Sequence, residues 1–269
     1  MMKKILLAAL ISISSTLTFA ETAAPAQNPV FASVEKLVQA KDYAGAYKEL
    51  EKIAKTGNAQ ALYHLAVLTQ IGQGTTKDEK KALDLFQQAA KKGDPLANYT
   101  LAKSYMMGGN LGLKPDVQKA KEYFQASAKA GFEDANVDLA VLFFSENKAE
   151  SDKQGLAKLE PLMKKNHPQA IYAKALYDIN LGFKNKDEKS VKSGLTAIQQ
   201  LAEKGYIPAL MAVGNMFTNG NIIDQDLVKA KEIFSLLAQK NVPNAKESLA
   251  LVEKMMAEKA KPAAAKSKS

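Results

Sequence analysis

The sequence predicts an all-α protein, a right-handed solenoid of about six stacked helix pairs. Two interleaved sequence patterns lead to this fold class. In the first pattern, a small residue is followed four positions later by Leu or Val and then by another small residue. Successive copies of this pattern begin 36, 38, 35, 39 and 36 residues apart. A second pattern of small, bulky and small residues ending in Gly or Asn lies between these copies. Alternating runs of β-branched and aromatic residues, which would indicate strands, are not found in the sequence.

The first residues have the features of a secretory leader. Lys3 and Lys4 form a short positive region, residues 5–13 are apolar, and Thr18 and Ala20 place small residues at the −3 and −1 positions of a cleavage site. The apolar segment is shorter than the ~20 residues that cross a bilayer. We therefore expect a signal peptide over residues 1–20 cleaved after Ala20, a flexible linker over 21–29, no membrane span after cleavage, and a periplasmic or secreted protein.

The first pattern marks the first helix of each predicted pair. A small residue lets two helices approach closely, and the larger residue one turn later fills the groove beside it. The initial small residues of this pattern are Ala61, Ala97, Ala135, Ala170, Ala209 and Ala245.

The second pattern marks the second helix of each pair. Its residues at offsets 0, 4 and 8 share one helix face, and Gly or Asn at offset 11 ends the helix because either tolerates a left-handed conformation. The bulky offset-4 residues are Leu50, Phe86, Phe124, Leu159, Ile198 and Phe234. The helix-ending residues are Gly57, Gly93, Gly131, Asn166, Gly205 and Asn241.

One helix pair cannot cover its own apolar face, so stacked neighbours cover it and the two ends need caps. Residues 30–57 are expected to form an opening pair with a short connection at Lys41-Asp42-Tyr43, and residues 245–257 a single closing helix. The repeat domain then spans 30–257, and residues 258–269, rich in Lys and Ala, form a disordered tail.

Composition argues against several functions. The formal net charge is +9, but every basic residue is Lys, and Arg and Trp are missing from the sequence. Nucleic-acid binding favours clustered Arg and stacking aromatic residues, so we expect no nucleic-acid partner. The chain has no Cys, which removes thiolate ligands and a Cys nucleophile. We expect no cofactor.

Fragments of catalytic motifs are short and isolated. Ser33 to Lys36 and Ser145 to Lys148 fit S-x-x-K, and residues 55–57 fit K-T-G, as in penicillin-recognising enzymes. The expected helices leave no strand on which to place the K-T-G. His64 and His167 are the only histidines and lie in different repeats, so no metal site is expected. We expect no catalytic residues and interpret the chain as a non-enzyme.

The repeating residues resemble the Sel-one-like repeat (SLR) family, a longer relative of the tetratricopeptide repeat. Ala61, Leu65 and Ala66 followed by Gly72 and Gly74 match the first half of the unit, and residues 81–93 match its second half. The second and fifth units match in the same way. The third and fourth units depart from the pattern, with Gly155 and Gly194 in place of Ala and Lys174 in place of Leu.

The resemblance implies an exported adaptor or scaffold that binds a peptide or protein on its concave face, which the first helices would line. The alternative function is a weak hydrolase acting on cell-wall or β-lactam substrates, as described for cysteine-rich members of the family. Carried over from the ligand-contacting positions of tetratricopeptide units, the partner-binding residues would be Tyr63, His64, Gln70, Tyr99, Lys103, Met106, Asp138, Tyr172, Met211 and Asn215.

Overall fold

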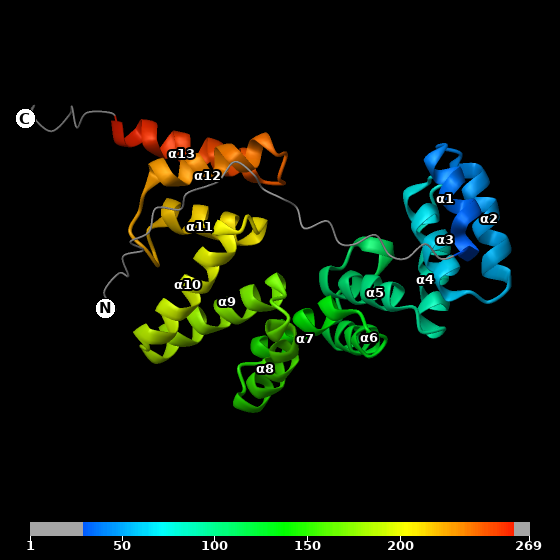
Figure 1. The fold of residues 1–269 in the computed structure, drawn as a ribbon, viewed down its shortest axis with the longest axis horizontal. Coiled ribbons are helices and arrows are strands. Elements are labelled where there is room, and N and C mark those ends of the chain that lie inside the picture. Colours follow the sequence, from blue (N-terminus) through cyan, green and yellow to red (C-terminus); the bar gives the residue numbers. More distant parts are fainter. Residues whose placement is uncertain (1–28, 261–269) are drawn as a thin grey trace, which may run out of the picture. The chain divides into compact units, whose positions relative to one another are not determined.

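A computed structural model of the protein describes residues 29–260, which form thirteen α-helices and two short 3-10 helices and contain no strand. The predicted signal peptide and most of the predicted linker and tail lie outside this range. The helices group into two units, divided between Lys165 and Asn166, and each unit is described by itself. The predicted all-α solenoid of about six helix pairs is confirmed (Figure 1).

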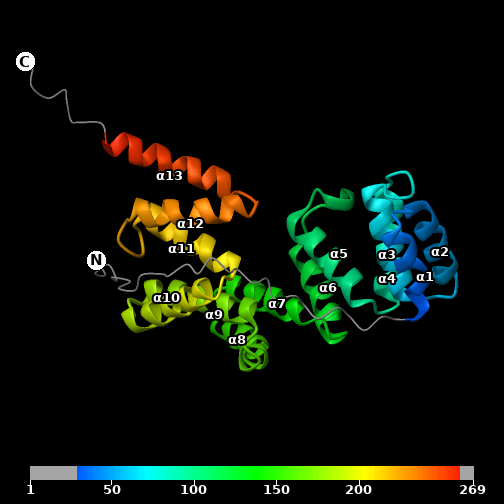
Figure 2. The same ribbon diagram turned by 45° about the horizontal axis from the view of Figure 1, so that its top comes forward.

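The N-terminal unit (29–165) holds four helix pairs, and consecutive helices pack side by side along the chain. Figure 2 shows α1 to α4 as one compact group of short helices, followed by α5 and α6. Its helices are η1 (Pro29–Phe31), α1 (Ala32–Gln39), α2 (Tyr43–Lys55), α3 (Ala59–Ile71), α4 (Glu79–Lys91), α5 (Pro95–Met107), η2 (Asn110–Gly112), α6 (Val117–Lys129), α7 (Glu133–Ser145) and α8 (Ala149–Lys164).

The C-terminal unit (166–260) holds two helix pairs and a closing helix. A single cluster of buried side chains joins its five helices. They are α9 (Pro168–Asn185), α10 (Glu188–Glu203), α11 (Ile207–Asn219), α12 (Leu227–Gln239) and α13 (Ala245–Ala260).

Each predicted helix-ending residue adopts the left-handed conformation. Gly57, Gly93, Gly131 and Gly205 have φ between 80° and 95°, whereas Asn166 and Asn241 have φ of 58° and 55°. Glycine carries no Cβ penalty here, and asparagine is the side chain that tolerates the region best. The sequence pattern therefore locates the tight turn that follows each second helix.

The small residues of both patterns form the helix contacts. All six initial alanines of the first helices have no exposed surface, and neither do Ala46, Ala82, Ala120 and Ala230 of the second helices. The six bulky residues at offset 4 are at most 2% exposed. Close approach at the alanines lets these larger side chains fill the neighbouring grooves, which is the packing that stabilises each stack.

The third and fourth pairs depart from the pattern for a steric reason. A Cβ on Gly155 would lie 2.5 Å from the Phe144 ring, and a Cβ on Gly194 would lie 2.5 Å from the carbonyl oxygen of Ala175. Glycine is thus required by closer packing at these two sites. The glycine loop is also missing in these pairs, and α8, α9 and α10 have 16, 18 and 16 residues against 13 in regular helices such as α3 and α4.

The closing helix α13 runs three residues past its predicted end, to Ala260, so the predicted boundary of the tail at residue 258 is too early. In these added residues Lys259 donates a hydrogen bond to Gln225 in the loop before α12, and in the turn before them Met255 and Met256 pack against the core of the C-terminal unit. These contacts keep the extra turn helical. The predicted opening pair is present as α1 and α2, with Lys41 at a φ of 59° in the connection.

Candidate partner-binding face

The three pairs that follow the opening pair in the N-terminal unit have α3, α5 and α7 as their first helices, and local signals begin two of these helices. The Asn58 side chain accepts a hydrogen bond from the Ala61 amide, and Asp94 accepts one from Ala97, so each caps its helix. Pro95 occupies the first turn of α5, where no amide hydrogen is needed. α7 begins at Glu133, and Phe132 before it provides no side-chain cap.

A side-chain hydrogen bond joins two consecutive first helices. Tyr99 in α5 donates to Oδ2 of Asp138 in α7 at 2.8 Å. One repeat earlier, burial raises the pKa of the Tyr63 phenol in α3, and the nearby Thr100 hydroxyl of α5 acts in the opposite direction. In both pairs a tyrosine at offset 2 lies near the offset-3 residue of the next unit. The bond from Tyr99 to Asp138 holds α5 and α7 together.

Tyr99, Lys103 and Asp138, three of the predicted site residues, come together at the second link. Lys103 Nζ lies 3.4 Å from Asp138 Oδ1 and 5.9 Å from the centre of the Tyr99 ring. The side chains of Lys103 and Asp138 are 40% and 29% exposed. The cluster combines a cation, an anion and a phenol at the protein surface.

Tyr63 and Tyr99 are half-buried between repeats. The Tyr63 ring lies 5.8 Å from that of Phe86, and the Tyr99 ring lies 4.7 Å from that of Phe132. Burial raises the pKa of both phenols, and the Asp138 carboxylate raises that of Tyr99 further. Much of each ring therefore packs between repeats, and only part of it remains for a ligand.

His64, predicted as a ligand contact, is also half-buried. Its ring lies 5.7 Å from that of Phe31 and 5.4 Å from that of Tyr63, edge to face in both cases. Burial lowers the pKa of its imidazole, and the nearby Asp94 carboxylate acts in the opposite direction. The sequence pattern missed this arrangement because Phe31 comes from η1, outside the repeats.

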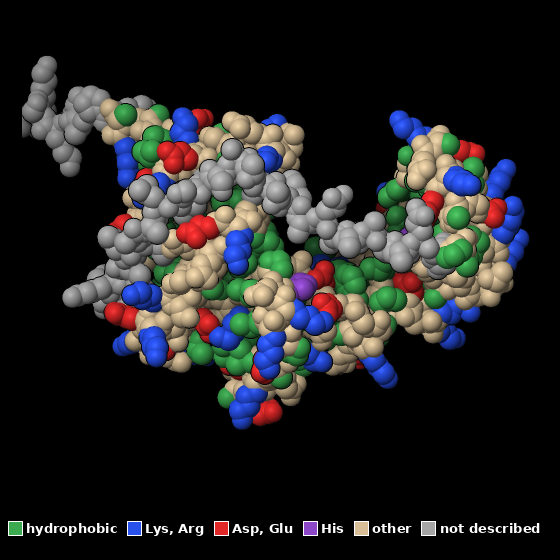
Figure 3. All heavy atoms as spheres, viewed as in Figure 1, with side chains coloured by type: hydrophobic (Ala, Val, Ile, Leu, Met, Phe, Trp, Pro, Cys, Tyr) green, Lys and Arg blue, Asp and Glu red, His purple; other side chains and the backbone are tan. Residues whose placement is uncertain are grey.

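The most accessible residues of this face lie on the later turns of its helices. Gln70 and Met106 are half-buried, and Met106 packs against the buried cluster around Phe124. Ile71, Met107 and Val141 are 58%, 68% and 50% exposed, one on each first helix. In Figure 3, hydrophobic side chains reach the surface over α3 and α5, whereas Lys side chains stand along the edge over α2 and α4.

The remaining predicted residues, Tyr172, Met211 and Asn215, belong to the C-terminal unit. The Tyr172 ring in α9 lies 5.8 Å from that of Tyr206, which precedes α11, and burial raises the pKa of its phenol. Met211 is half-buried against the core, and Asn215 is exposed. Tyr172 and Tyr99 make the same kind of contact, since each packs on the residue that precedes the next first helix.

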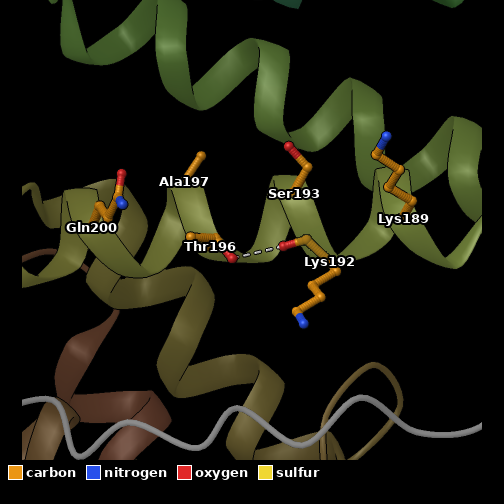
Figure 4. A pocket seen from close by; sticks show the side chains of 6 residues that line it. All are labelled: Lys189, Lys192, Ser193, Thr196, Ala197 and Gln200. Carbon is orange, nitrogen blue, oxygen red and sulfur yellow. Dashed lines mark hydrogen bonds between the residues drawn. The ribbon is translucent and has the colours of Figure 1, made fainter.

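A shallow hollow lies along α10, where the sequence predicted no site. Figure 4 shows that its lining comes from one helix, with Thr196 Oγ1 donating to the Lys192 carbonyl at 2.9 Å within the helix itself. No second element supplies a facing group, so the hollow does not converge on a bound molecule. The lining residues are Lys189, Lys192, Ser193, Thr196, Ala197 and Gln200.

The fragments of catalytic motifs occupy structural positions. Thr56 closes α2 by donating to the Ile53 carbonyl at 2.7 Å, and Gly57 makes the turn that follows. Ser145 donates to the Leu142 carbonyl at 2.7 Å at the end of α7. Over residues 29–260, no three His, Asp or Glu side chains gather as a metal site would require, and no helix has the length and apolar character to cross a membrane.

The Sel1 repeat family model matches three segments of the chain, residues 59–94, 95–132 and 207–242. These segments hold α3 with α4, α5 with α6, and α11 with α12. They are the three units in which the sequence pattern is regular.

Solved structures with the same fold come from several bacteria. A Sel1 repeat protein from Oxalobacter formigenes has a TM-score of 0.64 at 19% identity, over 86% of this chain and 90% of that one. A protective antigen of uropathogenic Escherichia coli with an SLR fold has a TM-score of 0.57 at 22% identity, over 79% of this chain. An immunity protein from Pseudomonas aeruginosa has a TM-score of 0.50 at 17% identity, over 82% of this chain and 85% of that one.

The match spans 45% of the Escherichia coli antigen, so this chain corresponds to less than half of that protein. No curated protein matches the chain. At these identities the comparisons establish the fold.

Proposed function

Because the chain is a Sel1 repeat protein, we propose that it is an exported binding module that holds a peptide or protein on the face formed by α3, α5 and α7. Sel1 repeat folds typically mediate protein–protein interactions. The hydrogen bond from Tyr99 to Asp138 supports this role, because it holds the first helices α5 and α7 in a fixed arrangement. A pre-organised array loses little entropy when a ligand binds.

The exposed side chains of these helices carry the proposal. Ile71, Met107 and Val141 keep half or more of their surface in water, and Lys103 adds a charged group between them. Exposed apolar residues beside polar ones are typical of interaction sites. Methionine adapts its shape to different apolar partners, which suits an adaptor.

The test is capture of partners from an envelope extract by the mature protein. The wild type is compared with a triple variant of the face and with a double variant that serves as control. Ile71→Ser, Met107→Ser and Val141→Ser together change only exposed positions on the first helices. Val117→Ser with Val228→Ser is the matched control, because these valines are 57% and 58% exposed but lie on second helices. A partner held by the wild type and the control but lost by the triple variant supports the proposal. A partner held equally by all three proteins contradicts it.

Export is a separate part of the proposal and rests on residues 1–20 of the sequence. Fractionation of the producing cell should place the protein in the periplasm or the medium. The mass of the purified protein should correspond to a chain that begins at Glu21. Full-length protein retained in the cytoplasm would contradict export and leave the binding face unaffected.

A further inference from the structure

We propose that Met107 is a reversible oxidation site, where a peroxide converts the thioether to a sulfoxide and makes an exposed apolar part of the face of α3, α5 and α7 polar. The consequence, weaker binding of a ligand on that face, rests on the proposed function. The proposal is carried by the exposure of Met107, by its place at the end of α5 and by the lack of Cys in the sequence.

Exposure sets Met107 apart from the other methionines in the described part of the chain. Met107 is 68% exposed, whereas every other methionine between residues 29 and 260 is half-buried. An oxidant in solution reaches an exposed sulfur more readily than a sulfur that is packed among other side chains. The half-buried methionines are Met106, Met163, Met211, Met216, Met255 and Met256.

Met106 and Met107 are neighbours in the chain but lie in different surroundings. Met106 packs against the buried cluster that contains Phe124. Met107 is the last residue of α5, and Gly108 and Gly109 follow it without side chains that could shield its sulfur. A Cβ on Gly109 would meet no atom within 4 Å, so the turn after α5 is open to solvent at this point. The oxidant therefore has preferential access to Met107.

The reaction requires a peroxide as its only co-reactant. The sulfur of Met107 attacks a peroxide oxygen, so that an S–O bond forms, the O–O bond breaks, and the peroxide takes two electrons from the sulfur. With hydrogen peroxide, the departing hydroxide takes the proton of the new S–OH group and leaves as water. The sequence has no Cys, so no thiol of the protein competes for the oxidant. Methionine sulfoxide reductases restore the thioether, which makes the change reversible.

The sulfoxide changes the surface of the face and leaves the core unchanged. Ile71, Met107 and Val141 are the exposed apolar residues of the three first helices, and Met107 is the most exposed of them. Oxidation replaces a flexible apolar side chain with a polar one, which weakens apolar contacts with a partner. Met106 and its buried neighbours keep their packing. Peroxide should therefore lower the affinity of the face while the protein stays folded.

The first readout is peptide mass spectrometry of the mature protein after treatment with a limiting amount of hydrogen peroxide. Met106 and Met107 fall in one tryptic peptide, residues 104–119, and its fragment ions assign the added oxygen to one of them. We expect Met107 to be oxidised several times faster than Met106 and than the other half-buried methionines. Equal rates at Met106 and Met107 would overturn the proposal.

The second readout is retention on a phenyl-agarose resin, which reports exposed apolar surface, with each protein compared before and after peroxide. The wild type should elute earlier after oxidation and regain its retention after treatment with the reductases for both sulfoxide epimers. Met107→Leu should show no change on oxidation. Met163→Leu is the matched control, because Met163 is half-buried in α8, and this variant should respond as the wild type does.

Unchanged retention of the oxidised wild type, or an equal loss of retention in Met107→Leu, would overturn the proposal. Loss of the helical circular dichroism signal on oxidation would overturn it as well, because the damage would then lie in the core. Selective oxidation of Met107 with the expected loss of retention supports the modification site. If the triple variant then captures the same partners as the wild type, the modification site stands and the proposed function falls.

Discussion

Tyr99 in α5 donates its phenolic hydrogen to Oδ2 of Asp138, 39 residues later in α7. The bond connects two first helices that belong to consecutive repeats. The same hydrogen bond thus belongs to the candidate binding face and stabilises the packing between repeats. A substitution at Tyr99 can therefore change both ligand binding and stability.

Tyr99→Phe should lower the free energy of unfolding by about 1–2 kcal/mol, because the ring contacts stay while a charge-assisted hydrogen bond is lost. Tyr63→Phe removes a hydroxyl whose neighbour Thr100 is uncharged and should cost less, at most about 0.5 kcal/mol. Urea unfolding of both variants measures the difference. A cycle with Asp138→Asn isolates the pair, and an equal loss in the two Phe variants would argue against the charged bond.

Gly155→Ala should destabilise the N-terminal unit by about 1–3 kcal/mol, although alanine is the better helix former. The reason is the 2.5 Å approach of the new Cβ to the Phe144 ring. Adding Phe144→Leu should recover part of the loss by opening space. Thermal unfolding of the single and double variants checks this, and a stabilised Gly155→Ala protein would mean that the helices can separate freely.

Gly93→Ala isolates the cost of the left-handed backbone, because a Cβ there meets no atom within 4 Å. We expect a loss of about 1–2 kcal/mol from conformation alone. Asn241→Gly, at the equivalent turn of the C-terminal unit, should leave stability within about 0.5 kcal/mol. Chemical denaturation of both variants gives the comparison, and a neutral Gly93→Ala would show that this turn can adopt another conformation.

The repeat register could be predicted from the sequence because it depends on residue size at fixed spacing. Ala97, Phe124 and Gly131 each occupy the position that their offset indicates, buried in the helix contact or ending the helix. Helix length in the irregular pairs could not be predicted in this way. No glycine loop follows α9, so the end of this helix at Asn185 depends on packing rather than on a local signal.

The candidate face was predicted at the level of the helix but not of the side chain. An offset states which way a residue points, not whether a large ring lies in the groove or between two repeats. Tyr63 and Tyr99 lie partly between repeats, because Phe86 and Phe132 pack on them. Lys103 lies beside the Tyr99 ring and Asp138, and its side chain stays 40% exposed.

Acidification should weaken the fold through His64. Burial between Phe31 and Tyr63 lowers the pKa of this imidazole below its usual 6.5, so the unfolded chain takes up a proton at a pH where the folded chain does not. Stability should therefore be constant above this pH and fall as the pH is lowered below 6.5. Asp94 has the opposite effect on stability, because burial raises the pKa of its carboxyl above the usual 3.8. The carboxyl titrates in a more acidic range than the imidazole.

The measurement is urea unfolding from about pH 7.5 to about pH 5.5 in a His167→Gln background, where His64 is the only histidine left. The free energy of unfolding should decline toward the acid end. The same series with His64→Gln added should be flat, since glutamine does not titrate. A decline of equal size in both proteins would assign the pH dependence to other groups and place His64 in a more hydrated setting than its contacts with Phe31 and Tyr63 indicate.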